Sequence, residues 1–396
     1  MFSQRSSWHT SPLSLSALAG SMRDSGTPVL DLAESNPTAC GLLAPEDLLA
    51  ASPSPRDIQQ YHPDPRGWVG ARKAVARLYR EVGATIDPDH VLLTSGTSEA
   101  YSFLLRLLCN PGENILVPRP SYPLFDLIAD LNDVELRAYD LHHGGEWIVD
   151  MESVRRQTDG STRAIVLVHP NNPTGSYVKD NERAELEQWA AEKRMALMVD
   201  EVFWWYPLRD GNARRASFVS AERCLTFSLN GISKFLGLPQ MKLAWMVVSG
   251  PSDVRRAAIE RLDIITDTYL SVGTPVQRAL PALLKQRAQL HGPIRERVRG
   301  NLDVLRKLVT GMPELTLLDP EGGWSAVLRL PNVKSDNEWA EELLRRRGVL
   351  VHPGHFYGFM AGSYVIVSLL VEAHTFSDGI REIGKAMTEH QGVHLE

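Results

Sequence analysis

The middle of the chain alternates short apolar runs with helical stretches, and this alternation restricts the possible folds more than any other feature. Helical sequences lie between several of the runs, as at 98–108 and 180–194. Strand, helix and strand in repetition predict an α/β fold with a mostly parallel sheet covered on both faces. The runs that read as buried strands are VLLTS from Val91, NILVP from Asn114, AIVLV from Ala164, MALMV from Met195, CLTFS from Cys224 and LAWMVV from Leu243.

The pattern changes from about residue 290. A long amphipathic helical sequence at 294–309 is followed by the strand-like runs SAVLRL, GVLVH and YVIVSLL. A chain of 396 residues is long enough for two domains. We expect a large domain over 46–289 and a smaller α+β domain made of 1–45 together with 290–396.

Composition restricts the partners. A net charge of −6 gives no reason to expect a nucleic acid or an anionic membrane as partner. Three widely spaced cysteines form no CxxC pair, which is typical of a reducing compartment. No apolar run approaches the length of a membrane span, and the first 20 residues lack the apolar core of a secretory signal. We expect a cytoplasmic protein that acts on a small molecule.

Four polar features follow strands of the predicted sheet. They are the segment 96–98, which opens a helix, then Asn172, Asp200 and Lys234. Each alone has an ordinary interpretation: a helix cap, a turn, a second cap and a solvated loop lysine. Because ligands of open α/β sheets bind beyond the carboxyl ends of the strands, the four features should converge at one edge.

This combination matches the needs of pyridoxal 5′-phosphate. A phosphate binds at a helix N-terminus, where free N–H groups and the helix dipole attract an anion. The pyridinium nitrogen requires a carboxylate, which Asp200 supplies, and the aldehyde requires a lysine, which Lys234 supplies. The sequence therefore predicts a pyridoxal-phosphate site at this edge.

Six motifs in register carry a resemblance to a known family. They are YHPDPRG at Tyr61, GTSEA at Gly96, PSY at Pro120, NPTG at Asn172, DEVF at Asp200 and SK at Ser233. With them the chain resembles the fold-type I aminotransferases of class I/II over almost its whole length. The resemblance implies a mostly parallel seven-stranded sheet in the large domain, a PLP-dependent aminotransferase activity and a homodimer with shared active sites.

The resemblance also implies roles for single residues. Lys234 forms a Schiff base with the cofactor and moves the substrate proton, and Asp200 pairs with the ring nitrogen. Tyr61 reaches the phosphate bound by the partner subunit. The resemblance places the remaining cofactor contacts at Gly96, Thr97, Ser98, Tyr122, Asn172, Phe203, Ser233 and Lys242.

The sequence departs from the family pattern at four positions, and in this it resembles a divergent branch with SNPT, DEVF, LPQ-x-K-L and SLL. Phe203 replaces a tyrosine beside the ring hydroxyl, and Lys242 replaces a phosphate-binding arginine. Ile366 stands where the family has the arginine that binds the substrate carboxylate, and Ser35 replaces a glycine that faces the same group.

Two interpretations of Ile366 remain open. Another cation, such as Arg66, Lys242 or one from the partner subunit, binds the carboxylate, or recognition rests on a larger and partly apolar substrate. We favour the second. The candidate substrate residues are Ser35, Trp204, His355, Tyr357 and Ile366. For Trp204 and the adjacent Trp205, packing in the core is favoured over a place in the substrate wall. His352 and His355 lack a third ligand, so no metal site is expected.

The predicted activity is transfer of an amino group from an amino acid, or a similar amine, to a 2-oxo acid. The alternative keeps the cofactor but ends in β-elimination, C–S bond cleavage, decarboxylation or oxidative deamination, acting on a bulky amino-acid conjugate. The same fold supports these outcomes, so the fold does not decide between them. A regulator with an aminotransferase-like domain is disfavoured, because no DNA-binding helix-turn-helix sequence or basic patch is present.

Overall fold

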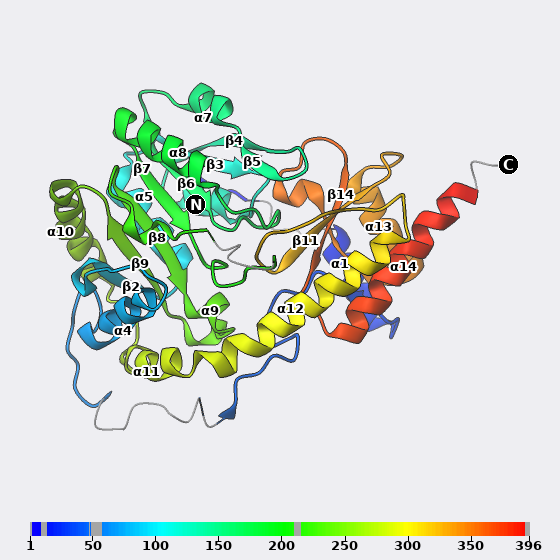
Figure 1. Cartoon of the computed structure of the whole chain (residues 1–396), viewed down its shortest axis with the longest axis horizontal. Helices are drawn as coiled ribbons and strands as arrows, with labels where there is room; N and C mark the ends of the chain where they lie inside the picture. The colour runs from blue at the N-terminus through cyan, green and yellow to red at the C-terminus, as the bar shows by residue number, and fades with distance from the viewer. Residues whose placement is uncertain (1, 9–13, 47, 49–57, 210–214, 393–396) are drawn as a thin grey trace.

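A computed structural model of the protein describes residues 2–8, 14–46, 48, 58–209 and 215–392. Its largest element is an eight-stranded sheet in the order β2-β9-β8-β7-β6-β3-β4-β5 (Figure 1). The strands are β2 (Val91–Thr94), β3 (Asn114–Arg119), β4 (Glu135–His143), β5 (Trp147–Val149), β6 (Thr162–Val168), β7 (Ala196–Asp200), β8 (Thr226–Gly231) and β9 (Ala244–Ser249).

The six apolar runs predicted as strands form β2, β3, β6, β7, β8 and β9. The strands β8, β7, β6, β3 and β4 are parallel, whereas β9 is antiparallel to β8 and to β2. The predicted number of seven strands was wrong for the described residues. β5 adds an edge strand by folding back antiparallel on β4, and a three-residue strand leaves no apolar run in the sequence.

Helices cover both faces of this sheet, as the sequence predicts. One face packs Val166, Met198 and Phe227 against Leu104 and Leu262 of the covering helices. The opposite face packs its alternate strand residues against other helices. The helices of this part are α4 (Val69–Arg80), α5 (Thr97–Leu108), α6 (Leu124–Leu131), α7 (Met151–Gln157), α8 (Asp180–Lys193), α9 (Ile232–Phe235), α10 (Ser252–Tyr269) and α11 (Thr274–Lys285).

The rest of the chain forms a second, smaller α+β body. An antiparallel sheet has the order β10-β11-β14-β13, and β1 pairs in parallel with β12. These strands are β1 (Leu30–Asp31), β10 (Thr316–Leu318), β11 (Ser325–Leu330), β12 (Val349–Leu350), β13 (His352–Pro353) and β14 (Ser363–Ser368), with helices α1 (Ser14–Asp24), α12 (Arg287–Thr310), α13 (Asp336–Arg347) and α14 (Ala373–Gly392). The structure also has short 3₁₀ turns along the whole chain, and three of them, η2 to η4, lie in the large body. They are η1 (Gln4–Ser6), η2 (Pro88–His90), η3 (Phe218–Ser220), η4 (Pro239–Met241) and η5 (Gly354–Tyr357).

The helix α12 runs without a break from the large body to the small one. It appears as the long yellow helix in Figure 1, beside the red α14 against which it packs. The predicted domain boundary at 289/290 falls inside the first turn of this helix. The division into 46–289 and 1–45 with 290–396 therefore remains a prediction.

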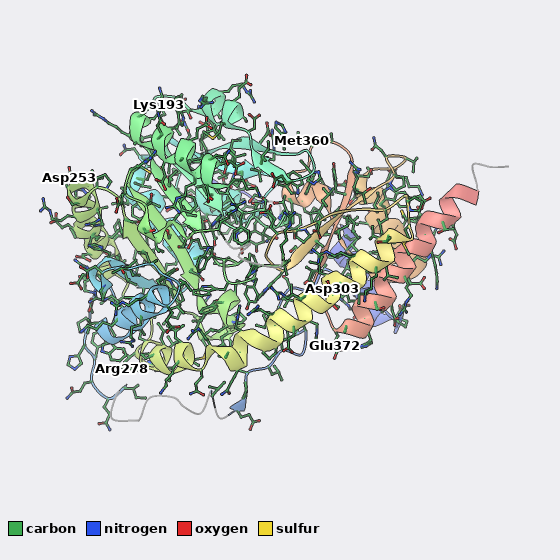
Figure 2. All side chains as sticks on the ribbon, in the orientation of Figure 1. Lys193, Asp253, Arg278, Asp303, Met360 and Glu372 are labelled. Atoms are coloured by element: carbon green, nitrogen blue, oxygen red, sulfur yellow. The ribbon has the colours of Figure 1, made fainter. Side chains whose placement is uncertain are left out.

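An apolar cluster joins the edge of the large sheet to the small sheet. Trp147 of β5 packs with Leu318, Val327 and Ile366, which come from β10, β11 and β14. All four side chains are buried. Figure 2 draws the side chains of both bodies, and the exposed Met360 marks the surface of the small one.

Candidate active site

A cavity of about 330 Å³ lies at the carboxyl ends of the parallel strands, between the large and the small sheet. The large sheet contributes the ends of β6, β7 and β8 and the start of α5, and the small sheet contributes β11, β13 and β14. The cavity brings together most of the predicted site residues: Ser35, Thr97, Ser98, Tyr122, Asn172, Asp200, Phe203, Ser233, Lys234, Tyr357 and Ile366.

Lys234 lies in α9, a single helical turn that begins directly after β8. The hydroxyl of Tyr206 lies 2.9 Å from the backbone oxygens of both Lys234 and Phe235, so it fixes the position of this turn. Burial lowers the pKa of the Lys234 amine, and the negative charges of Asp200 and Glu34 oppose this shift in part. Burial therefore favours the neutral, nucleophilic form of the amine.

Asp200 ends β7, the strand next to β8. Its carboxylate accepts hydrogen bonds from the Tyr101 hydroxyl at 3.2 Å and from the Val202 N–H at 3.1 Å. Burial raises the pKa of Asp200 to about 6, although both hydrogen bonds and the Lys234 amine act in the other direction. Removal from water is thus the dominant influence, and a cationic ring nitrogen at this position would favour the ionised carboxylate.

The N-terminus of α5 forms the predicted anion site. Gly96 precedes the helix, and Thr97 and Ser98 are its first residues and line the cavity. A Cβ atom at Gly96 would lie 3.8 Å from the Nζ atom of Lys242, so the Lys242 amine reaches the same place. Free N–H groups, the helix dipole and an ammonium group together suit a phosphate.

The remaining cofactor candidates form the walls of the cavity. The side chain of Asn172 accepts a hydrogen bond from the Ser325 hydroxyl of β11 at 3.3 Å. Phe203 packs edge to face on Trp324, with ring centroids 5.2 Å apart. The Lys234 amine lies 5.5 Å from the centroid of the Trp324 ring. Tyr122 is 46% exposed, which places it at the mouth of the cavity.

The structure places Trp204 and Trp205 in the core, so Trp204 was wrong as a candidate substrate residue of this cavity. Trp204 and Trp205 are 3% and 7% exposed, belong to the main apolar core and do not line the cavity. The Trp204 indole N–H donates to the backbone oxygen of Arg215 at 2.9 Å. Two large apolar rings after a strand end gain more from packing in the core than from a half-solvated wall.

His355 also lies outside the cavity, which corrects its prediction as a substrate residue. Its backbone N–H and its Nδ1 atom contact the carboxylate of Asp336 on α13, at 2.5 and 3.2 Å. His352, three residues earlier, lines the cavity instead. The sequence signal that could have found it is its place at the end of the predicted strand GVLVH.

The other predicted residues lie apart from the cavity. The guanidinium of Arg66 pairs with the carboxylate of Asp263, with nitrogen–oxygen distances of 2.7 and 2.5 Å. Arg66 is therefore not the cation that replaces the missing arginine in this cavity. Tyr61 is 69% exposed and lines a separate surface hollow. Sequence reasoning also missed three wall residues, Tyr101, Trp324 and Ser325.

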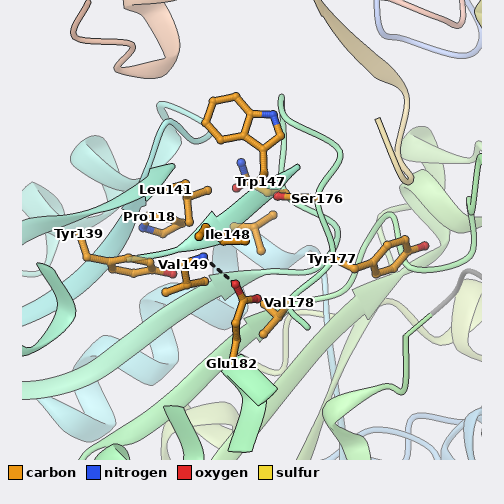
Figure 3. Close-up of a pocket in the computed structure, with 12 residues that line it drawn as sticks. Pro118, Tyr139, Leu141, Trp147, Ile148, Val149, Ser176, Tyr177, Val178 and Glu182 are labelled. Carbon is orange, nitrogen blue, oxygen red and sulfur yellow. Dashed lines mark hydrogen bonds between the residues drawn. The ribbon is translucent and has the colours of Figure 1, made fainter. Parts of the chain in front are cut away.

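A second cavity lies on the other side of the Asn171 loop (Figure 3). Figure 3 shows Glu182 accepting a hydrogen bond from the Val149 N–H, at 2.8 Å, beside Tyr139 and Trp147. The volume of about 20 Å³ is room for a single water molecule. This cavity is too small for a cofactor, so the larger one is the candidate site.

The described residues contain neither a cluster that could bind a metal ion nor a helix that could span a membrane. Within the described ranges, no three or more histidine, cysteine, aspartate or glutamate side chains gather where they could hold a metal ion. Of the helices that the structure describes, none combines the length and the apolar character needed to cross a membrane.

Comparisons with known proteins identify the family. The profile of the family described as aminotransferase class I and II matches residues 27–368. The glutamate-pyruvate aminotransferase AlaA of Haemophilus influenzae is 25% identical, and the match covers 93% of each chain. The S-alkyl-thiohydroximate lyase SUR1 of Arabidopsis thaliana is 26% identical over 82% of this chain and 72% of the other. The structure of an alanine aminotransferase from Pyrococcus furiosus superimposes with a TM-score of 0.89 at 23% identity, covering 98% of this chain and all of that one.

The chain belongs to the aminotransferase class I and II family. Enzymes of this class use pyridoxal phosphate, and the protein is a PLP-dependent aminotransferase. The residues present suit the cofactor: Gly96 leaves room at the anion site, Asp200 is a partly buried carboxylate, and Lys234 is an amine with a lowered pKa.

Proposed function

We propose that the enzyme transfers the amino group of an amino acid with a neutral, largely apolar side chain. The observation that supports this is the lining of the cavity, to which the buried Ile366 and the rings of Tyr357, Trp324 and Phe125 contribute apolar surface. A second carboxylate, as in aspartate or glutamate, needs a cationic partner. Lys234 is the only lysine or arginine among the described residues that line the cavity.

The reacting groups of the proposed site come from the large sheet. When bound, the cofactor withdraws electrons from the substrate and makes its Cα–H acidic. Lys234 takes the proton from Cα, and burial, which lowers the pKa of its amine, favours this role. Asp200 keeps a proton on the ring nitrogen, and Asn172 donates to the ring hydroxyl.

The proposed phosphate contacts are Gly96, Thr97, Ser98 and Lys242, and Tyr122 and Phe203 supply the ring contacts. Ser233 precedes the lysine and completes this wall. Tyr61 is exposed and so is available to a second subunit, in agreement with a proposed homodimer in which each subunit completes the phosphate site of the other. We further propose that the enzyme is cytoplasmic.

Several relatives carry the name alanine or glutamate-pyruvate aminotransferase. These names support transamination over elimination in this chain. The names do not identify the amino donor. The apolar lining of the cavity favours leucine, methionine, phenylalanine or tyrosine, or a larger conjugate, over dicarboxylic amino acids.

Steady-state kinetics over a panel of amino donors tests the proposal. With one 2-oxo acid in excess, kcat/KM for apolar donors should exceed that for aspartate and glutamate by about 10-fold or more, the effect of one lost charge-assisted hydrogen bond. Product analysis by mass spectrometry runs in parallel, since release of pyruvate and ammonia from a cysteine conjugate would indicate elimination instead. High kcat/KM for aspartate would contradict the apolar assignment.

A further inference from the structure

His352 occupies the position directly across from Ile366. In the antiparallel pair of β13 and β14 the Cα partner of His352 is Ile366, and the Cα partner of Pro353 is Val365. Directly opposed residues of an antiparallel pair project to the same face of a sheet. Both side chains accordingly line the cavity. The place that lacks an arginine thus has a histidine as one of its two direct cross-strand neighbours, and the other is Val327 of β11.

The imidazole of His352 pairs with the hydroxyl of Tyr357. The Nδ1 atom and the Tyr357 oxygen are 3.1 Å apart, and Tyr357 also lines the cavity. A neutral imidazole and a phenol have two polar hydrogens between them, and their mutual bond uses one. One donor is therefore left for a ligand. Within the described part of the chain, the Nε2 atom of His352 has no hydrogen-bond partner.

Burial and nearby carboxylates act on the pKa of the His352 imidazole in opposite directions, and burial has the larger effect. Burial lowers the pKa of His352, and the carboxylates of Asp31 and Glu34 oppose this shift. Asp31 is bound to Arg23 at 2.5 Å, Glu34 accepts from the Asn36 N–H at 2.7 Å, and neither lines the cavity. The other titratable groups among the described residues that line the cavity are Tyr101, Tyr122, Asp200, Lys234 and Tyr357, whereas Asp336 on α13 is engaged with His355. A carboxylate that entered the cavity would favour the imidazolium.

We propose that His352, positioned by Tyr357, binds the carboxylate of the amino-acid substrate in place of the arginine that the chain lacks. This inference rests on the proposed function of the same cavity. It makes His352 a specificity-determining residue and Tyr357 a positioning residue. Because one donor replaces a two-pronged guanidinium, recognition of the carboxylate is weaker, and the apolar wall contributes a larger share of the affinity.

The test compares a substrate with a carboxylate and one without, using wild-type holoenzyme and His352→Leu. Phenylalanine and 2-phenylethylamine differ by that group alone, and the first half-reaction is followed through cofactor absorbance. His352→Leu should raise KM for phenylalanine about 10- to 100-fold, with kcat changed only a few-fold, and leave the amine unaffected. His355→Leu is the matched control, since it removes an exposed imidazole outside the cavity. Equal effects on both substrates, or none on either, would overturn the proposal.

A binding measurement gives a readout that does not need turnover. Calorimetric titration of the holoenzyme with 3-phenylpropionate, in buffers of different ionisation enthalpy, measures the protons taken up. Wild type should take up a fraction of a proton and bind more weakly as the pH rises, whereas His352→Gln should take up none. If the wild type also takes up none, the inference fails.

The two ideas can fail separately. If no amino acid of the donor panel is deaminated by a holoenzyme that shows normal cofactor absorbance, the proposed function is wrong. If apolar amino acids react normally and His352→Leu changes nothing, only the assignment of His352 is wrong.

Discussion

The two walls of the cavity differ in how the chain places their residues. The wall of the large sheet carries Lys234, Asp200 and Asn172 at the ends of parallel strands, whereas the other wall carries His352 and Ile366 on an antiparallel pair. The first wall keeps the lysine, aspartate and asparagine of the family pattern and departs from it at Phe203, whereas the second lacks the arginine that the family has at position 366. In the proposed site, the cofactor-binding residues come mainly from the large sheet and the carboxylate-binding residue from the small one, so one can change while the other is kept.

The largest expected effect comes from removing the amine of the first wall. Lys234→Ala should lower turnover at least about 10³-fold, because proton transfer and covalent attachment of the cofactor are lost together. Borohydride reduction should no longer attach the cofactor to the peptide containing residue 234. Lys73→Ala, which alters an exposed lysine, should behave as wild type. Normal turnover by Lys234→Ala would remove the functional distinction between the walls.

Asp200→Asn tests the electrostatic part of the same wall. A neutral amide cannot hold a proton on the ring nitrogen, so kcat should fall at least about 100-fold while the protein still folds. Asp267→Asn, on the surface of α10, is the control. Near-native rates in Asp200→Asn would contradict the role of the carboxylate as the partner of the ring.

Ile366→Ala probes the second wall through stability. Ile366 is 2% exposed, and its truncation should lower the free energy of unfolding by about 2–5 kcal/mol. Thermal unfolding of the holoenzyme measures the change. Ile264→Ala, at a position 71% exposed, should stay within about 0.5 kcal/mol of wild type. Equal stability of the two variants would show that Ile366 contributes little packing.

The free energy of unfolding should depend on pH because of Glu201, which follows Asp200 of the first wall in the chain. Glu201 is fully buried, and burial raises its pKa to about 7. An acid with a raised folded-state pKa stabilises the fold below its unfolded-state pKa, and this contribution is lost as the pH rises through the folded-state value. Stability should therefore fall between about pH 4.5 and pH 7, by up to about 3 kcal/mol. Thermal unfolding across this range should show a shallower slope for Glu201→Gln, and an unchanged slope for the exposed Glu222→Gln.

The smallest expected effect is at Phe203. Phe203→Tyr would add a hydroxyl group next to the cofactor-binding residues and stabilise the anionic ring oxygen. The pKa at which the bound cofactor changes its visible absorbance should fall by about 1 unit. Spectrophotometric titration measures this value, with Phe203→Leu as the control. An unchanged or raised pKa would argue against the placement of residue 203 beside the ring hydroxyl.

The first wall could be predicted because parallel strands deliver their carboxyl ends to one edge, so sequence order alone brings Asn172, Asp200 and Lys234 together. The second wall could not be predicted in the same way. On β13 and β14 the facing of a side chain depends on register, and a shift of one residue reverses it. His352 was therefore not recognised as a cavity residue, and His355, which lies beyond β13 in η5, was chosen instead. Trp204 was wrongly predicted as a substrate residue because the position of a tryptophan after a strand end does not show whether its ring packs in the core or lines a cavity.

The cluster of Trp147, Leu318, Val327 and Ile366 affects the free energy of substrate binding. It holds the edge of the large sheet against the small sheet through apolar contacts that involve no ligand. The two walls are therefore held together by contacts within the folded chain, which include the ion pair of Lys179 with Glu321 as well as this cluster. An incoming substrate meets a preorganised cavity, so less of its binding free energy is lost to ordering the protein.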